Sequence, residues 1–414
     1  MTDHKLPMRA KLATSLSRGA AALSRATGRG DGSVIGGRLA LMVDPNLLAE
    51  LAAGREIALI SGTNGKTTTT RLTAAAMGVL GDVATNSLGA NMPTGHTSAL
   101  AKAGATPYAV LEVDEHYLKQ VLDATRPRVV ALLNLSRDQL DRAKEVAMMA
   151  ALWRDALPGR DLHLVANADD PMVVWAAGKA VASGTGVTWV AAGQRFHDDS
   201  WVCPECGASI LRNGDQWACV AGNLSRPVPT WAVSGDGVVD STGAYHHIEL
   251  QLPGRVNRAN AATALAVAAH FGVPPAKAVP ELAKVASIAG RYAVVERDGR
   301  VVRLLLSKNP AGWLEAFDMA DDVPTLLSIN ARDPDGLDTS WLYDVDFSPL
   351  RGRRVLVTGD RAMDLAVRLE VNEVPFEHVK SFSQALTLIP PGRLEVIANY
   401  TAFQDIRAEL DRVN

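Results

Sequence analysis

Residues 57–68 have the sequence Ile57-Ala58-Leu59-Ile60-Ser61-Gly62-Thr63-Asn64-Gly65-Lys66-Thr67-Thr68. An apolar run is followed by a glycine-containing turn and by a segment that we expect to begin a helix at Lys66. This order is the context of a phosphate-binding loop, because the turned backbone N–H groups and the helix N-terminus both attract an anion. In such a loop Lys66 would reach the β- and γ-phosphates, and the Thr67 hydroxyl would bind Mg²⁺.

The loop departs from the usual spacing at one position. A first glycine is expected five residues before Gly65, where this chain has Ile60, and Gly62 stands three residues before Gly65 instead. The alternative is an ordinary glycine turn, but the combination of strand, loop and helix favours a nucleotide site. We therefore expect the phosphates to be bound by the whole run Gly62, Thr63, Asn64, Gly65, Lys66, Thr67 and Thr68.

Composition limits the function classes. The chain has 414 residues, enough for two or three domains, with 47% hydrophobic residues, 21% charged residues and a net charge of −3. No overall basic field points to nucleic acid, and no apolar run reaches the roughly 20 residues of a membrane span. Three cysteines fit a reducing cytoplasm. The basic, Ala- and Ser-rich stretch Arg9–Arg25 favours an amphipathic first helix over an organelle transit peptide.

The rhythm of apolar runs predicts an α/β fold with two α/β domains. Residues 1–54 form a helical lead-in, residues 55–290 a central domain, and residues 291–414 a C-terminal domain. A small β-rich module that holds all three cysteines interrupts the central domain at about 195–235. Parallel strands are predicted at Ile57–Ile60, Tyr108–Val113, Val129–Leu135, Leu162–Asn167, Val301–Leu306, Thr325–Ile329, Arg354–Thr358 and Leu394–Ala398, and a helix at Asn260–Phe271.

Further segments, together with the loop, resemble the Mur ligase family. They are Asn86–Met92, Leu111–Glu115, Asn134–Asp141, Asn167–Pro171 and Leu252–Ala262. The resemblance implies a P-loop ATPase domain followed by a Rossmann-like C-terminal domain. It also implies that Glu112 binds magnesium with Thr67, that Asn134 lines the nucleotide site and that Asn260 contacts adenine. Residues 1–54 are too few for the family's N-terminal UDP-binding domain, which suits a lipid-linked substrate.

The resemblance is closer to one branch of the family, the MurT branch. It rests on Gln139, where amino-acid-adding Mur ligases usually carry His, on the Cys-x-x-Cys insertion, on Ser307–Gly312 and on Asp335–Phe347. The branch implies ATP-dependent amidation of the α-carboxyl of D-glutamate in the lipid II stem peptide, through an acyl phosphate, to give D-isoglutamine. Ammonia would come from a separate GatD-type glutaminase subunit, so we expect a heterodimer in the cytoplasm at the inner face of the membrane.

One aspartate is expected to serve the partner. In the branch, an aspartate of this stretch completes the Cys–His pair of the glutaminase, and a carboxylate is suited to orient such a histidine. We assign this role to Asp338 rather than to Asp335, Asp344 or Asp346; the alternative is a surface acidic loop. Trp341 and Tyr343 suit either a protein interface or a partly buried core. The expected catalytic set is then Lys66, Glu112 and Asp338.

Other residues are assigned by the same resemblance. Lys308 and Asn309 would reach ATP from the C-terminal domain, although Asn-Pro is also a common turn. Asp114 and Glu115 either assist at the metal or are solvated strand-end carboxylates. Gln139 in place of histidine argues against a second magnesium ion.

The cysteines indicate a zinc ribbon that lacks one ligand. Cys203 and Cys206 form a Cys-x-x-Cys pair, and Cys219 follows, but the position that would complete a second pair is Gly222. His197 or a water would be the fourth ligand if zinc is bound. Alternatively the ribbon binds no metal and the cysteines are buried small hydrophobes.

Other functions are also compatible with the phosphate loop or with the cysteine module. They are a Mur-type amino-acid ligase for another peptidoglycan precursor, a generic P-loop ATPase or kinase, and a zinc-ribbon nucleic-acid-binding module. The helix near Asn260 and the appended α/β domain argue against a simple kinase. The acidic balance and the incomplete cysteine set argue against nucleic acid.

Overall fold

The computed structural model describes residues 6–26, 33–86, 90–137, 146–286, 292–297 and 299–411. The chain forms two compact units. Unit 1 holds the described residues of 1–135, 146–252 and 256–286, and unit 2 those of 136–145, 253–255 and 287–414. Among the described residues, no helix combines the length and apolarity that crossing a membrane requires.

Unit 1 is built on a nine-stranded sheet with the order β11-β10-β9-β6-β5-β4-β1-β3-β2. Its strands β1 to β6 are parallel, and β10 and β11 pair in the antiparallel sense. The bounds are β1 Glu56–Ser61, β2 Val83–Thr85, β3 Tyr108–Val113, β4 Val129–Leu132, β5 His163–Asn167, β6 Gly186–Ala191, β9 Trp231–Ser234, β10 Gly237–Val239 and β11 Tyr245–His247. The central strands predicted from apolar runs are thereby confirmed, except that β4 ends at Leu132 and not at Leu135 as predicted.

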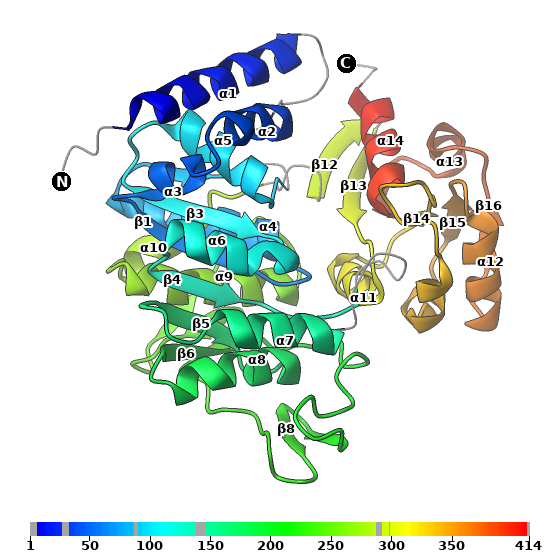
Figure 1. Cartoon of the computed structure of the whole chain (residues 1–414). Helices are drawn as coiled ribbons and strands as arrows, with labels where there is room; N and C mark the ends of the chain where they lie inside the picture. The colour runs from blue at the N-terminus through cyan, green and yellow to red at the C-terminus, as the bar shows by residue number, and fades with distance from the viewer. Residues whose placement is uncertain are drawn as a thin grey trace. The chain divides into compact units, whose positions relative to one another are not determined.

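Helices cover both faces of this sheet because successive strand residues point to opposite sides. Ile57 and Leu59 contribute to one core, and Ala58 and Ile60 to the other. The first core is covered by α1 (Met8–Ala26), α2 (Ser33–Val43), α3 (Leu47–Ala52), α5 (Pro93–Ala103), α6 (Leu118–Thr125), α7 (Val146–Ala156) and α8 (Pro171–Ala182). The second is covered by α4 (Lys66–Met77), α9 (Arg255–His270) and α10 (Pro275–Leu282) (Figure 1). The helix predicted at Asn260–Phe271 is α9, which begins five residues earlier, at Arg255, and ends at His270.

The cysteine module is a small hairpin of β7 (Ile210–Asn213) and β8 (Gln216–Cys219). Buried polar contacts attach it to the turn that follows β5 of the large sheet. The indole N–H of Trp217 donates to the Ala168 carbonyl at 3.0 Å, and Arg226 pairs with Asp169 at 2.7 Å, with both side chains almost fully buried. The predicted insertion is thus a packed part of unit 1.

Unit 2 is a second α/β layer structure with the sheet order β12-β13-β17-β14-β15-β16. Strands β13 to β17 are parallel and β12 is an antiparallel edge strand. The bounds are β12 Tyr292–Arg297, β13 Arg300–Leu306, β14 Thr325–Ser328, β15 Val355–Thr358, β16 Phe376–His378 and β17 Gly392–Ala398. One face carries α11 (Pro310–Met319), η3 (Ser340–Asp344), η4 (Ser348–Leu350) and α12 (Ala362–Val371); the other carries α13 (Phe382–Leu388) and α14 (Tyr400–Asp411) (Figure 1).

Candidate active site

The phosphate loop lies at the carboxyl edge of the parallel strands of unit 1. β1 pairs with β3 so that Ile60 is level with Glu112 and Ser61 with Val113. The register therefore brings the end of β3 beside the loop that follows β1. Helix α4 begins at Lys66, as predicted, and Gly65 precedes it with φ +83°. A Cβ at Gly65 would lie 2.6 Å from the Asn260 amide oxygen, so both the backbone angle and the space require glycine here.

The Lys66 side chain is buried and contacts the phosphate loop. Its ammonium group pairs with the Glu115 carboxylate at 3.0 Å and donates to the carbonyl oxygens of Gly62 and Thr63. Both side chains of the pair are at most a tenth exposed. An ammonium group has three N–H donors, so Lys66 must exchange one of these oxygens to bind a phosphate. Glu115, left open by the sequence, is thereby placed at the site.

Thr67 and Glu112 form the second pair of the site. The Thr67 hydroxyl donates to one oxygen of Glu112 at 2.8 Å, and Glu112 is fully buried. Its other oxygen has no hydrogen-bond partner among the described residues. A buried carboxylate oxygen without a partner is costly unless a cation or donor meets it. This pair fits magnesium, which prefers carboxylate and hydroxyl oxygens.

Two residues hold the backbone of Glu112. Asn86 donates to its carbonyl at 2.7 Å and accepts from its N–H at 2.8 Å, and a ring nitrogen of His96 lies 2.7 Å from the same carbonyl. Burial lowers the pKa of His96 to about 4, so the ring is neutral and donates. Asn86 was expected only as part of a family-like segment, and no local motif marks His96, which lies in α5.

The loop itself is fixed by Asn134 and Asn260. Asn134 accepts from the Asn64 N–H at 2.9 Å and donates to the Asn64 carbonyl at 3.0 Å. Its own carbonyl accepts from the Thr63 N–H. Asn260, on α9, accepts from the Thr69 hydroxyl at 3.1 Å. Both residues hold the shape of the phosphate loop in this structure, and contacts of either with a nucleotide remain a prediction.

A buried aspartate links the next strand ends to this loop. Asp170 accepts from the N–H groups of Leu135, Met172 and Val173, so it caps α8 and ties it to the chain that follows Asn134. Burial raises the pKa of Asp170 to about 6. Because its oxygens are used by backbone donors, this residue of the family-like turn has a structural task.

In unit 2, the four candidate aspartates differ in exposure. Asp335 is buried and accepts from the N–H and hydroxyl of Thr401, while Asp346 accepts from Ser348. Asp344 pairs with Arg137 at 3.1 Å. Asp338 is exposed, and the Ser340 N–H, at 2.8 Å, holds the pKa of its carboxyl below the usual range. Asp335 is thereby excluded as a carboxylate open to a partner, whereas Asp338 is exposed, as are Asp344 and Asp346.

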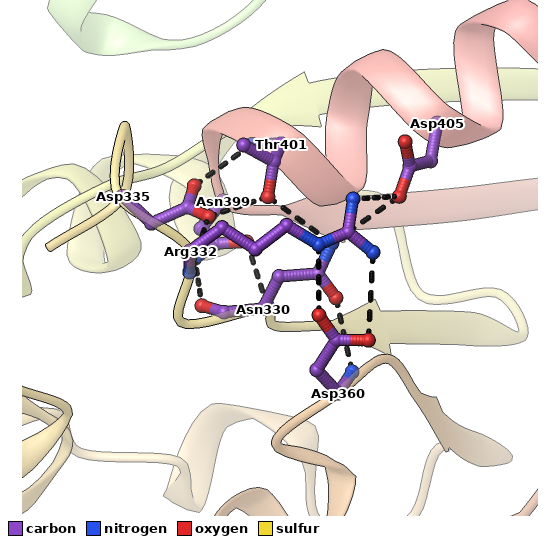
Figure 2. Close-up of polar contacts among 7 residues, drawn as sticks. All are labelled: Asn330, Arg332, Asp335, Asp360, Asn399, Thr401 and Asp405. Atoms are coloured by element: carbon purple, nitrogen blue, oxygen red, sulfur yellow. Dashed lines mark hydrogen bonds and ion pairs between the residues drawn. The ribbon is translucent and has the colours of Figure 1, made fainter. Parts of the chain in front are cut away.

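A polar network anchors the segment that leads to Asp338. Figure 2 shows Arg332 between Asp360 and Asp405, at 2.8 and 2.7 Å. The Asn399 side chain, just after β17, accepts from the N–H of Asn330 and donates to its carbonyl, beyond the end of β14. The loop after β14 is thus tied to three neighbouring elements before it reaches Asp338.

The aromatic residues beside Asp338 divide between core and surface. Trp341 is buried, with its ring centroid 6.3 Å from that of Trp313, whereas Tyr343 is 68% exposed. The guanidinium of Arg368, on α12, lies 4.8 Å from the centre of the Tyr343 ring. Of the two readings left open by the sequence, Trp341 belongs to the core and Tyr343 to the surface.

Lys308 and Asn309 follow β13 in unit 2. The Asn309 side chain accepts from the Gly312 N–H at 2.8 Å and caps α11, which is the turn that Asn-Pro suggested. A contact of either residue with ATP stays a prediction. Gln139 lies outside the described residues.

The three cysteines come together as predicted. The sulfurs of Cys203, Cys206 and Cys219 all lie within 4.8 Å of one another, as three ligands of one tetrahedral zinc would. His197 is not part of this cluster. Gly222, at the position that would complete a second Cys-x-x-Cys pair, has no side chain to bind a metal. The donor set therefore fits zinc with one non-protein ligand.

Two segments of the chain match known protein families. Residues 60–201 match the Mur ligase middle domain, and residues 306–403 match the MurT ligase C-terminal domain. The chain is 29% identical to the lipid II isoglutaminyl synthase (glutamine-hydrolyzing) subunit MurT of Staphylococcus aureus (strain COL), over 98% of both chains. It is 29% identical to the subunit of the same name of Streptococcus pneumoniae, over 91% of this chain and 92% of the relative.

The fold is also similar to a solved structure. A pseudomurein peptide ligase type C from Methanothermus fervidus superimposes with a TM-score of 0.68 at 17% identity, over 89% of this chain and 81% of that one.

Proposed function

Because the chain belongs to the Mur ligase family, in its MurT branch, we propose that it is the ATP-dependent subunit that amidates the α-carboxyl of D-glutamate in lipid II. One observation carries the proposal. Lys66, Thr67 and Glu112 converge at the start of α4, where the Glu112 carboxylate keeps one buried oxygen without a partner. This arrangement is suited to a nucleotide with its magnesium ion rather than to a merely structural turn.

The reaction follows from these groups. An oxygen of the acceptor carboxylate attacks the γ-phosphorus, the bond to the β-phosphate oxygen breaks, and ADP leaves. Ammonia then adds to the acyl phosphate, loses a proton and displaces inorganic phosphate to leave the amide. Magnesium held by Thr67 and Glu112 would neutralise phosphate charge. Lys66 and the loop N–H groups bind the transferring phosphoryl group, so positioning and charge stabilisation supply the catalysis.

The ammonia source is a separate GatD-type glutaminase, and the two chains form a heterodimer in this proposal. Asp338 would complete the glutaminase site by orienting its histidine. An exposed apolar stripe supports this face of unit 2 as the docking surface. Met363, Val367 and Val371 follow one another at intervals of four along α12 and are each at least half exposed. The stripe belongs to the helix that bonds Thr339 through Asp364, next to Asp338.

Two finer points belong to the same proposal. The enzyme acts in the cytoplasm at the inner face of the membrane, where the lipid-linked acceptor is exposed. Zinc is bound by Cys203, Cys206 and Cys219 with a water as fourth ligand, and it stabilises the ribbon rather than taking part in the reaction.

The test is amidation of lipid II by the purified chain with Mg-ATP and ammonium chloride, followed by mass spectrometry, with Lys66→Ala alongside. We expect each stem peptide to show the mass change of a carboxyl-to-amide conversion, and the variant to show none. Lys119→Ala, on the exposed face of α6, is the matched control. Addition of an amino acid instead of ammonia would replace this proposal by an amino-acid ligase. Absence of product even with the glutaminase present would refute it.

A further inference from the structure

The N-terminal helices expose several large apolar side chains. On α1, Met8, Leu12, Leu16 and Leu23 are between 44% and 88% exposed, at helical spacing, and on α2 Leu39 and Met42 are 44% and 73% exposed. We call these six side chains the N-terminal apolar face. A large exposed apolar surface commonly marks contact with a membrane or another protein.

The opposite side of α1 already has its packing partners. Ala10, Ala13 and Ser17 are buried in unit 1, and the Ser17 hydroxyl lies 3.4 Å from that of Ser98 on α5. Arg18 donates to the Ala101 carbonyl at 2.9 Å. The helix is therefore held by its small residues, and its large apolar side chains are directed away from the core of unit 1.

The positive charge of the N-terminal segment indicates what kind of surface the N-terminal apolar face would bind. Residues 1–43 contain seven lysines and arginines against two aspartates and no glutamate, a formal charge of +5 in a chain whose net charge is −3. No acidic residue occurs in α1 or α2. Exposed basic residues Arg9, Lys11 and Arg38 flank the apolar face. A second copy of this surface would meet it with like charge, whereas an anionic lipid surface offers both phosphate charge and an apolar layer.

We propose that α1 and α2 are a membrane-docking element that lies on the anionic inner leaflet. The apolar side chains enter the boundary between headgroups and acyl chains, and the flanking lysine and arginines lie at the lipid phosphates. The helices lie on the bilayer and do not cross it. Such docking would hold the ligase close to a lipid-linked acceptor, and this benefit rests on the proposed function. The binding of α1 and α2 to the membrane does not depend on it.

The experiment is co-sedimentation of the full chain, copurified with its glutaminase partner, with vesicles that contain no acceptor. Vesicles of phosphatidylcholine with phosphatidylglycerol are compared with vesicles of phosphatidylcholine alone. We expect binding to the anionic vesicles and about tenfold weaker partitioning of the double variant Leu12→Gln/Leu16→Gln. Lys11→Gln should weaken partitioning by about fivefold, and this loss should disappear at high salt.

Matched controls use exposed residues elsewhere in unit 1. Leu211→Gln/Val228→Gln and Lys277→Gln should bind vesicles like the unmodified protein. Equal binding of all variants, or no binding to anionic vesicles, would overturn the inference. So would a self-associated form that Leu12→Gln/Leu16→Gln dissociates without any change in vesicle binding.

Amidation of a water-soluble muropeptide separates the two proposals. Vesicle binding without amidation would sink the proposed function and leave the docking element standing. Amidation without vesicle binding would refute the docking element and leave the proposed function standing.

Discussion

The two units place charged side chains at the carboxyl edges of their parallel sheets in opposite ways. In unit 1, Lys66, Glu112 and Glu115 are buried; Lys66 pairs with Glu115, and Glu112 accepts from the Thr67 hydroxyl. In unit 2, Arg332, Asp360 and Asp405 form an exposed ion-pair network, and Asp338 beyond it is open to solvent. Burial strengthens electrostatic interactions and excludes water, which suits phosphoryl transfer. An exposed, anchored carboxylate suits delivery to a second protein.

The largest effect on ammonia-dependent amidation should come from the buried edge. Glu112→Gln keeps the side-chain size and an oxygen for Thr67 but removes the charge that would hold magnesium. We expect amidation at saturating ATP to fall by about 10²–10³-fold, since one charge-stabilising group at a reacting centre is of this magnitude.

The control for this change is Glu56→Gln, an exposed carboxylate at the start of β1. Steady-state amidation and the melting temperature are measured for both variants. If Glu112→Gln amidates at the normal rate, the buried pair of Thr67 and Glu112 is structural and the magnesium assignment fails.

A smaller effect is expected at the exposed edge. Val367→Glu places a charge in the α12 stripe, where burial against the partner would desolvate it. The dissociation constant for the glutaminase should rise by about tenfold or more, with ammonia-dependent amidation unchanged. Titration calorimetry measures the change, and Val294→Glu, on the edge strand β12 and 52% exposed, is the control. Equal affinity of both variants would remove α12 from the interface.

The smallest effect concerns pH. Burial lowers the pKa of His96 to about 4, below the value of the unfolded chain, so the neutral ring stabilises the fold above about pH 6.5. This stability is lost as the pH falls toward 4. Between pH 6.5 and 5, unit 1 should lose roughly 2 kcal/mol through this group.

Urea unfolding at several pH values measures this loss. His96→Gln should unfold with a flatter pH dependence over this range, whereas His247→Gln, an exposed histidine, should not differ from the unmodified protein. An unchanged slope in His96→Gln would show that another group titrates.

Much of the fold followed from local patterns. The strand before Gly62 and the start of α4 at Lys66 were predictable because apolar runs and loop glycines act over a few residues. The role of Glu112 was expected from the family resemblance of the segment Leu111–Glu115. The clustering of the cysteines also followed from spacing within one short module.

The contacts that complete the site could not be predicted in this way. Lys66 and Glu115 are 49 positions apart, and they meet because β1 and β3 pair in one particular register. The hydrogen bond between the His96 ring and the Glu112 carbonyl likewise depends on how α5 packs against the sheet. In unit 2, exposure excludes one of the four candidate aspartates, because Asp335 is buried and accepts from Thr401, which lies 66 positions away. Tertiary packing decides each of these points.

The most direct test of this division between the two edges is Asp338→Asn, assayed with ammonium chloride and with glutamine in the copurified heterodimer. Asp346→Asn is the control in the same segment. We expect normal ammonia-dependent amidation and glutamine-dependent amidation reduced by about 10²–10⁴-fold, as for removal of a carboxylate that orients a catalytic histidine. Equal loss with both nitrogen sources, or no loss with glutamine, would contradict it.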